Sequence, residues 1–299
     1  MLFIYDDTTI KWEDEEKQFC LHIHADETAE SPRTAFDSST KMPCFHPRYS
    51  LGDESEVNKG ETPLEYMQRL VRNNIEESEI ISAALEGRLG SVRMEKCKGE
   101  EELYNVYVVS AMDTIFGRSE PSENLEAEKV SLGSSVYYIL DVLTFNDCKT
   151  LLRPCAEILP LWLYDHSGLT MSCGERNYPY NDQWDSCQTG WIIYFKEDVL
   201  KERYADETNW REQAHDYMKY EVKLYDEWLR GEVFGYTLYE RKSTEEEWQE
   251  IDSCWGFYGS DPVENGMADN VGHGLANAIE KNSYKDGTAQ YKVEKHVIL

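Results

Sequence analysis

The feature that most constrains this chain is its charge. It has 58 acidic and 30 basic residues, which gives a formal net charge of −28 at neutral pH. Such an imbalance keeps a protein soluble but destabilises the compact state through self-repulsion. The chain can offset this, because 40% of its 299 residues are hydrophobic and 12% are aromatic. Each buried aromatic side chain removes on the order of 150–250 Å² from water. We therefore expect a folded core and not a disordered acidic tail.

The charge also limits the partners and the location of the chain. Direct binding to nucleic acid is not expected, because it depends on Lys and Arg at the phosphates. The carboxylates form either an ordinary solvated surface or a surface that docks on a basic nucleic-acid-binding protein. The sequence has no 18-residue apolar run for a membrane span, and its start turns acidic without the basic region of a signal peptide. A cytoplasmic location is expected, with the 8 cysteines reduced.

Local patterns predict an α+β fold with mixed or antiparallel sheets and a few helices. One long amphipathic helix is expected near 208–230, because Met218, Val222, Tyr225 and Leu229 recur on one helical face. Further helices are expected at 62–88, with a break at 73–74, and at 275–281. Strands are expected at 2–5, 19–23, 103–118, 134–145, 159–163, 190–195, 235–241 and 251–258.

The domain organisation is only weakly marked in the sequence. Residues 119–129 are polar and acidic, which suggests a boundary around 119–130. We therefore expect an N-terminal α+β region at 1–118 and a C-terminal α+β domain at 130–299. Residues 26–60 are rich in Ser, Pro, Gly and Asp and are expected to form an ordered loop.

The most enzyme-like segment is the one that begins at Asp165 and His166. A carboxylate and an imidazole are needed together where an acid–base pair works, but neighbours on an extended chain point to opposite sides. The nearby residues Asp185 and Cys187 would complete a Cys/His site. The alternative is a turn in which Asp165 and Ser167 bond the backbone. No phosphate loop, dinucleotide fingerprint or hydrolase motif is present, and no cofactor is expected.

A metal site is a weaker hypothesis from the same sequence. Zinc sites need four ligands at suitable spacing, and no CxxC pair is present. Cysteine and histidine residues two positions apart would share one face of a strand, which ordinary packing also explains. The residues that such a site would draw on are Cys44, His46, His22, His24, Cys173 and Cys187.

Four blocks of sequence carry a resemblance to a known family. They are AESPRTAFDSSTKMPCFHPRYSLGDE at 29–54, LPLWLYDHSGLTMS at 159–172, WDSCQTGWIIYF at 184–195 and DSCWGFYGSD at 252–261. In this order they resemble a family of proteins carried by phages and conjugative elements of Gram-positive bacteria. The insert CGERNYPYN at 173–181 departs from the family pattern, which suggests a specialised variant.

Within that family, the size and acidity of the chain are similar to those of phage proteins that inhibit the bacterial Gabija defence complex. The resemblance implies a non-enzymatic homo-oligomer that binds this nuclease/helicase-type complex and prevents it from binding or cutting DNA. It assigns no interface residue to this sequence. Two alternatives stay open: an acidic DNA mimic that inhibits a restriction-type nuclease, and an enzyme that uses the Cys/His site.

Overall fold

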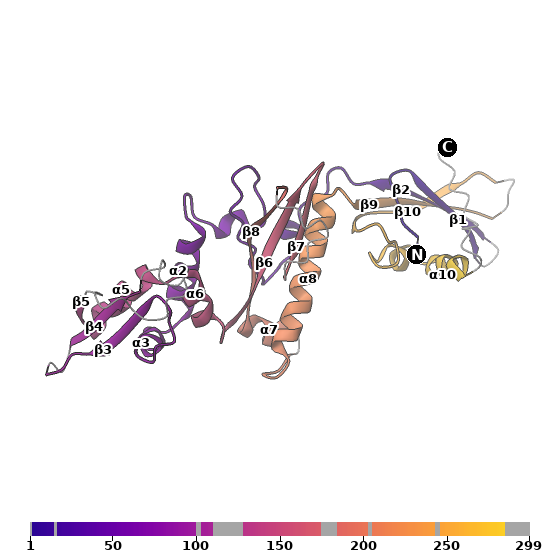
Figure 1. Cartoon of the computed structure of the whole chain (residues 1–299). Helices are drawn as coiled ribbons and strands as arrows, with labels where there is room; N and C mark the ends of the chain where they lie inside the picture. Colours follow the sequence, from indigo (N-terminus) through magenta and orange to yellow (C-terminus); the bar gives the residue numbers. More distant parts are fainter. Residues whose placement is uncertain are drawn as a thin grey trace.

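The computed structural model describes residues 2–14, 17–99, 103–109, 128–174, 184–202, 205–242 and 246–284. Helices combine with antiparallel sheets, which confirms the α+β class. The elements form three parts in a row, and the molecule is elongated (Figure 1). We call the sheets of these parts the terminal, central and distal sheets. Within the described residues, every helix is too short or too polar to cross a membrane.

The terminal sheet joins the two ends of the chain. Its strands, in spatial order, are β1 (Thr8–Asp14), β2 (Lys17–Ala25), β9 (Val233–Arg241) and β10 (Gln249–Tyr258). The expected antiparallel pair of β9 and β10 is confirmed. The short helices α9 (Met267–Val271) and α10 (Leu275–Tyr284) cover one face, where their apolar side chains share a core with those of the strands. The strand expected at 2–5 is wrong, because this segment is irregular and β1 begins only after a turn at Asp6 and Asp7.

The distal part packs helices on a small sheet. Its elements are α2 (Pro63–Asn74), α3 (Glu77–Leu85), β3 (Val92–Lys96), β4 (Leu103–Val108), β5 (Glu128–Ser131), α5 (Leu132–Val142) and α6 (Phe145–Leu152). The helix break expected at 73–74 is confirmed. The strand expected at 134–145 is wrong, because this segment forms α5 and the start of α6. Val136, Ile139 and Leu140 recur with helical spacing and are buried in the distal core.

The central part places a long helix against the central sheet. Its elements are α1 (Pro32–Ala35), a 3₁₀ turn (Glu54–Glu56), β6 (Ala156–Asp165), β7 (Leu169–Cys173), β8 (Ser186–Phe195), α7 (Lys196–Glu202) and α8 (Trp210–Leu229). The spatial order of the strands is β7-β6-β8. Side chains of α8, among them Met218 and Val222, share a core with Leu161 and Ile192 of the sheet. The helix thereby forms a rigid base for the segments that cross it.

The loop at 36–53 is ordered by contacts with β8 and α8. Lys41 and Cys44 form isolated bridges with Ile193 and Gly190, respectively. Gly190 has to be glycine here, because a Cβ atom would overlap the carbonyl oxygen of Pro43. The loop is therefore held against the central sheet, as the sequence predicted for an ordered segment.

The division expected at 119–130 stays a prediction, and one strand pairing connects the two expected regions. β2 belongs to the expected region 1–118 and β9 to the expected domain 130–299, but the two strands pair along their length. Residues 110–127 lie outside the described residues, as does most of the insert at 173–181.

Candidate functional site

The structure brings the enzyme-like residues to one end of the central sheet, with a different pairing from the one that their order suggests. The Nδ1 atom of His166 lies 2.8 Å from Oδ2 of Asp185. The adjacent carboxylate of Asp165 instead accepts hydrogen bonds from Nη2 of Arg48 at 2.6 Å and from the Tyr49 hydroxyl at 3.0 Å. The pairing of β6 with β8 explains this, because the Asp165 N–H donates to the carbonyl of Asp185.

The thiol near this pair is not activated. Partial burial raises the pKa of Cys187, and the negative charge of Asp165 adds to the increase. A nucleophilic cysteine needs a lowered pKa, because the thiolate is the reactive form. The imidazole of His166 is 62% exposed, so water is not excluded from the pair. The four residues therefore lie at one end of the central sheet, where His166 pairs with Asp185 and the thiol of Cys187 lacks the activation that a nucleophile requires.

The cysteines considered as metal ligands in the central part are engaged in packing. Cys44 and Cys173 lie against the core of the central part, and burial raises the pKa of Cys44 to about 12 and that of Cys173 to about 11. Nδ1 of His46 accepts the backbone N–H groups of Arg48 and Tyr49 at 3.3 Å each. These observations favour the packing interpretation for this segment.

His22 and His24 of β2 lie on the face of the terminal sheet that α9 and α10 do not cover. Burial lowers the pKa of His22, and its Nε2 atom has no hydrogen-bond partner among the described residues. His24 lies close to Asp6 and Asp7, with its Nδ1 atom 3.7 Å from Oδ1 of Asp7. This surface group holds three candidate ligand atoms but does not include the cysteines that the sequence suggested.

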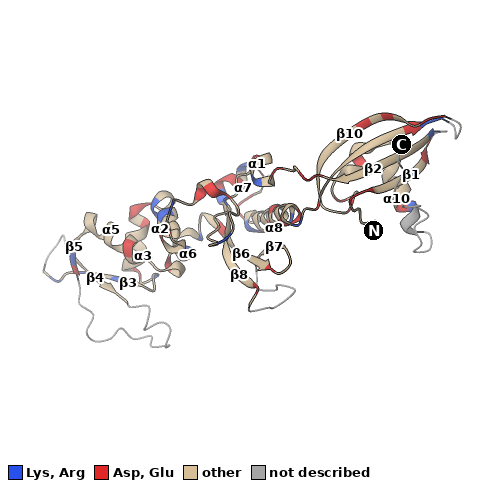
Figure 2. Cartoon of the chain, turned by 90° about the horizontal axis from the view of Figure 1, so that it is seen from above, with Lys and Arg blue, Asp and Glu red and all other residues tan. Residues whose placement is uncertain are grey.

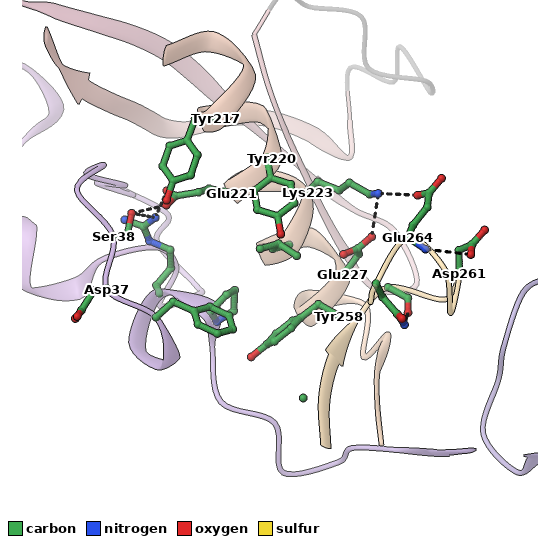
Figure 3. A pocket seen from close by; sticks show the side chains of 17 residues that line it. Asp37, Ser38, Tyr217, Tyr220, Glu221, Lys223, Glu227, Tyr258, Asp261 and Glu264 are labelled. Carbon is green, nitrogen blue, oxygen red and sulfur yellow. Dashed lines mark hydrogen bonds and ion pairs between the residues drawn. The ribbon is translucent and has the colours of Figure 1, made fainter. Parts of the chain in front are cut away.

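A cavity that the sequence did not reveal lies between α1, α8 and the segment after β10. We call it the α8 cavity; its volume is about 310 Å³. Figure 3 shows Tyr220, Glu227 and Tyr258 around the same opening. Phe36 completes this wall, with its ring edge-on to that of Tyr258 at 5.7 Å between centroids. Aromatic and acidic side chains thus line the same cavity.

One side of the cavity is fixed by a buried ion-pair network. Arg33 donates from Nη1 to Glu221 at 2.6 Å and holds Asp53 through two bonds of 2.8 Å each. The hydroxyl groups of Ser38 and Thr40 also donate to Glu221. Because Glu221 is part of α8, the network ties α1 and the following loop to this helix.

The other side contains a buried carboxylate. Glu227 is 6% exposed, and burial raises its pKa. Its Oε1 atom lies 3.7 Å from the ammonium of Lys223, which is also 3.2 Å from Glu264. Gly259 makes room for the carboxylate, because a Cβ atom there would lie 2.8 Å from Oε1 of Glu227. The segment after β10 is therefore shaped around this side chain.

The wall of the cavity that α8 supplies could have been found from the sequence, because its residues recur with helical spacing. Tyr217, Tyr220, Leu224 and Glu227 lie at i, i+3, i+7 and i+10, beside the apolar stripe used to predict the helix. One further wall comes from α1 and the following loop, nearly 200 positions away in the chain, and another from residues 256–265. No local pattern indicates that these segments meet.

No protein-family model matches the chain, and no curated protein or solved structure gives a match. The functional proposal therefore depends on the resemblance of the four sequence blocks and on the geometry and charge described above.

Proposed function

We propose that the chain is a non-enzymatic anti-defence protein of a phage or mobile element. It acts in the host cytoplasm, binds a bacterial defence complex of the nuclease/helicase type, and blocks DNA binding or cleavage by that complex. Gabija is the first candidate. The assignment to a defence complex follows from the resemblance of the sequence blocks at 29–54, 159–172, 184–195 and 252–261. The excess of 28 acidic over basic residues (58 minus 30) on an elongated body supports binding to a basic surface.

The distribution of this charge supports contact over a long surface. Figure 2 shows Asp and Glu positions, coloured red along the ribbon, in all three parts of the molecule. A complex that processes DNA must present Lys and Arg to the phosphates. An acidic body is complementary to such a surface, which speeds association and disfavours wrong partners.

Exposed aromatic residues add support for a protein interface. Tyr5, Tyr137 and Trp184 are mainly solvent-accessible, and they lie in the terminal, distal and central parts, respectively. Tyr and Trp are enriched at protein interfaces. We propose that some of these residues serve the assembly of a homo-oligomer and others the contact with the host complex.

The state of the Cys/His residues favours binding over catalysis. Cys187 has a raised pKa, and His166 is open to solvent. Catalysis with Cys187 as the nucleophile would need a thiolate, which the raised pKa disfavours. An inhibitor that acts by occupying a surface needs no thiolate.

Co-purification with the Gabija proteins tests the proposal. The tagged chain is co-expressed with the Gabija proteins, and the eluate is assayed for both components and for cleavage of DNA. We expect a stable complex with strongly reduced cleavage. Absence of Gabija proteins from the eluate, together with unchanged cleavage, would refute the assignment to Gabija.

A direct DNA mimic is the second candidate, because Asp and Glu residues occur in the terminal, central and distal parts of the molecule. The two candidates differ in their dependence on salt. A mimic that replaces 6–10 phosphate contacts would lose roughly 10³–10⁵-fold in affinity between 50 and 200 mM salt. An interface held by shape complementarity and apolar burial would change far less.

A further inference from the structure

The α8 cavity has a strong negative bias. Its lining includes five carboxylates, Asp37, Glu221, Glu227, Asp261 and Glu264, and two cations, Arg33 and Lys223. With all groups ionised, the sum is −3. Arg33 does not offset the remaining carboxylates, because its guanidinium is used by Asp53 and Glu221.

We propose that the α8 cavity receives a single Lys or Arg side chain from the protein that this chain binds. The inference rests on the proposed function, because it takes the partner to be a protein with a basic surface. It adds a specific anchor to an attraction that otherwise depends on overall charge.

The size of the cavity suits one side chain. A volume of about 310 Å³ is at the lower limit of the range for small-molecule sites, roughly 300–1,000 Å³. Such a space accommodates a long side chain but not a folded segment. Buried anchors of this kind, Arg among them, carry much of the binding energy at protein interfaces.

The aromatic walls favour a cation over an apolar group. Phe36 and Tyr220 are each more than half exposed, so their ring faces are accessible. An aromatic ring attracts a cation placed over its face through its quadrupole. A neutral side chain of the same length would lose this attraction and the attraction to the carboxylates.

Glu227 is the most buried of the five carboxylates that line the cavity. Its side chain is 8% exposed, and its Oε1 atom forms an ion pair of 3.7 Å with the ammonium of Lys223. Lys223 is 56% exposed and also contacts Glu264, so it bridges two carboxylates at the rim. An incoming guanidinium or ammonium group would add a charge-assisted hydrogen bond to a carboxylate whose present cation, Lys223, is shared with Glu264.

The test uses two probes that differ only in charge. N-acetyl-arginine methylamide and its neutral isostere, N-acetyl-citrulline methylamide, are titrated into the full chain and followed by NMR of backbone amides. We expect saturable shifts around Tyr220 and Gly259 with the arginine probe, and at least tenfold weaker binding of the citrulline probe. Absence of saturable shifts, or equal binding of both probes, would overturn the proposal.

Variants then connect the cavity to the partner. Glu227→Gln preserves the shape, and Tyr220→Ala removes an exposed ring, so both should fold. Each should weaken the arginine probe and the host complex at least tenfold, whereas Glu95→Gln, an exposed carboxylate of β3, should change neither. If the complex binds normally to both cavity variants, the inference fails while the proposed function stands. If no complex binds the wild-type chain, the proposed function fails even where the arginine probe binds.

Discussion

Replacement of Arg33 by methionine tests how the wall of the α8 cavity is held in place. The guanidinium is 5% exposed and contacts carboxylates that are also largely buried, at 14% for Asp53 and 9% for Glu221. Methionine fills a similar space without any donor. The change therefore leaves two buried carboxylates without their cation, while the surrounding packing stays nearly the same.

The expected cost follows from the partners that remain. Removal of one partner from a buried ion pair typically costs about 3–5 kcal/mol. We do not double this value for two carboxylates, because each keeps other donors. Glu221 retains the hydroxyls of Ser38 and Thr40, and Asp53 retains the backbone N–H of Met42 at 2.7 Å. The predicted loss is thus about 3–5 kcal/mol, a large fraction of the 5–15 kcal/mol that stabilises a typical protein.

Hydrogen exchange in α8 is the suitable assay, because it reports the stability of the central part separately from the other parts. Arg72→Met is the matched control. Arg72 lies 3.8 Å from Asp141, and both side chains are more than half exposed, so its loss should cost only about 0–1 kcal/mol.

A triple variant, Arg33→Met with Asp53→Asn and Glu221→Gln, separates lost attraction from buried unpaired charge. It should be more stable than Arg33→Met alone, because neutral amides are less costly to bury than carboxylates. The reasoning is refuted if the amides of α8 exchange as slowly in Arg33→Met as in Arg72→Met. It is also refuted if the triple variant is the least stable of the three.

Three further predictions concern the cavity and the Cys/His residues. Gly259→Ala should lower stability by about 1–3 kcal/mol more than Gly87→Ala in thermal unfolding. Both glycines have positive φ, but only at Gly259 would the Cβ atom meet Glu227. Equal losses of stability would contradict the steric argument. Burial raises the folded-state pKa of Glu227, so the folded protein favours the protonated side chain. The stability that this protonation contributes is lost as the pH rises from the unfolded pKa of about 4.3 through the folded value. The stability of Glu227→Gln relative to wild type should therefore increase between pH 4 and pH 8 in urea titrations, and a pH-independent difference would contradict it. His166→Ala and Cys187→Ala should each retain full inhibition of DNA cleavage, and loss of inhibition in either folded variant would favour the enzyme hypothesis.

The elements that sequence predicts well are those with strong local patterns. The helix near 208–230 and the pair of strands at 235–241 and 251–258 lie where their patterns place them, as α8, β9 and β10. The segment 134–145 misleads, because its β-branched and aromatic residues suit a strand while its helical spacing suits α5. Only the packing of its buried face on the distal core decides between the two.

Contacts between distant segments are where sequence reasoning ends. His166 has a carboxylate next to it in the chain, but strand pairing gives it Asp185 instead. The terminal sheet pairs β2 with β9, more than 200 residues apart, without any local signal. The α8 cavity likewise combines α1, α8 and the segment after β10. Such sites depend on register and on tertiary packing, which no short pattern encodes.

Phage plating on cells that carry Gabija tests the central claim most directly. The chain is expressed in these cells, and the plating of a Gabija-sensitive phage is counted. The His166→Ala/Cys187→Ala double variant is expressed in parallel. We predict that wild type and double variant restore plating to the level of cells without Gabija, because inhibition depends on binding and not on these side chains. Unchanged plating despite expression of folded protein, or restoration by wild type alone, would contradict the account.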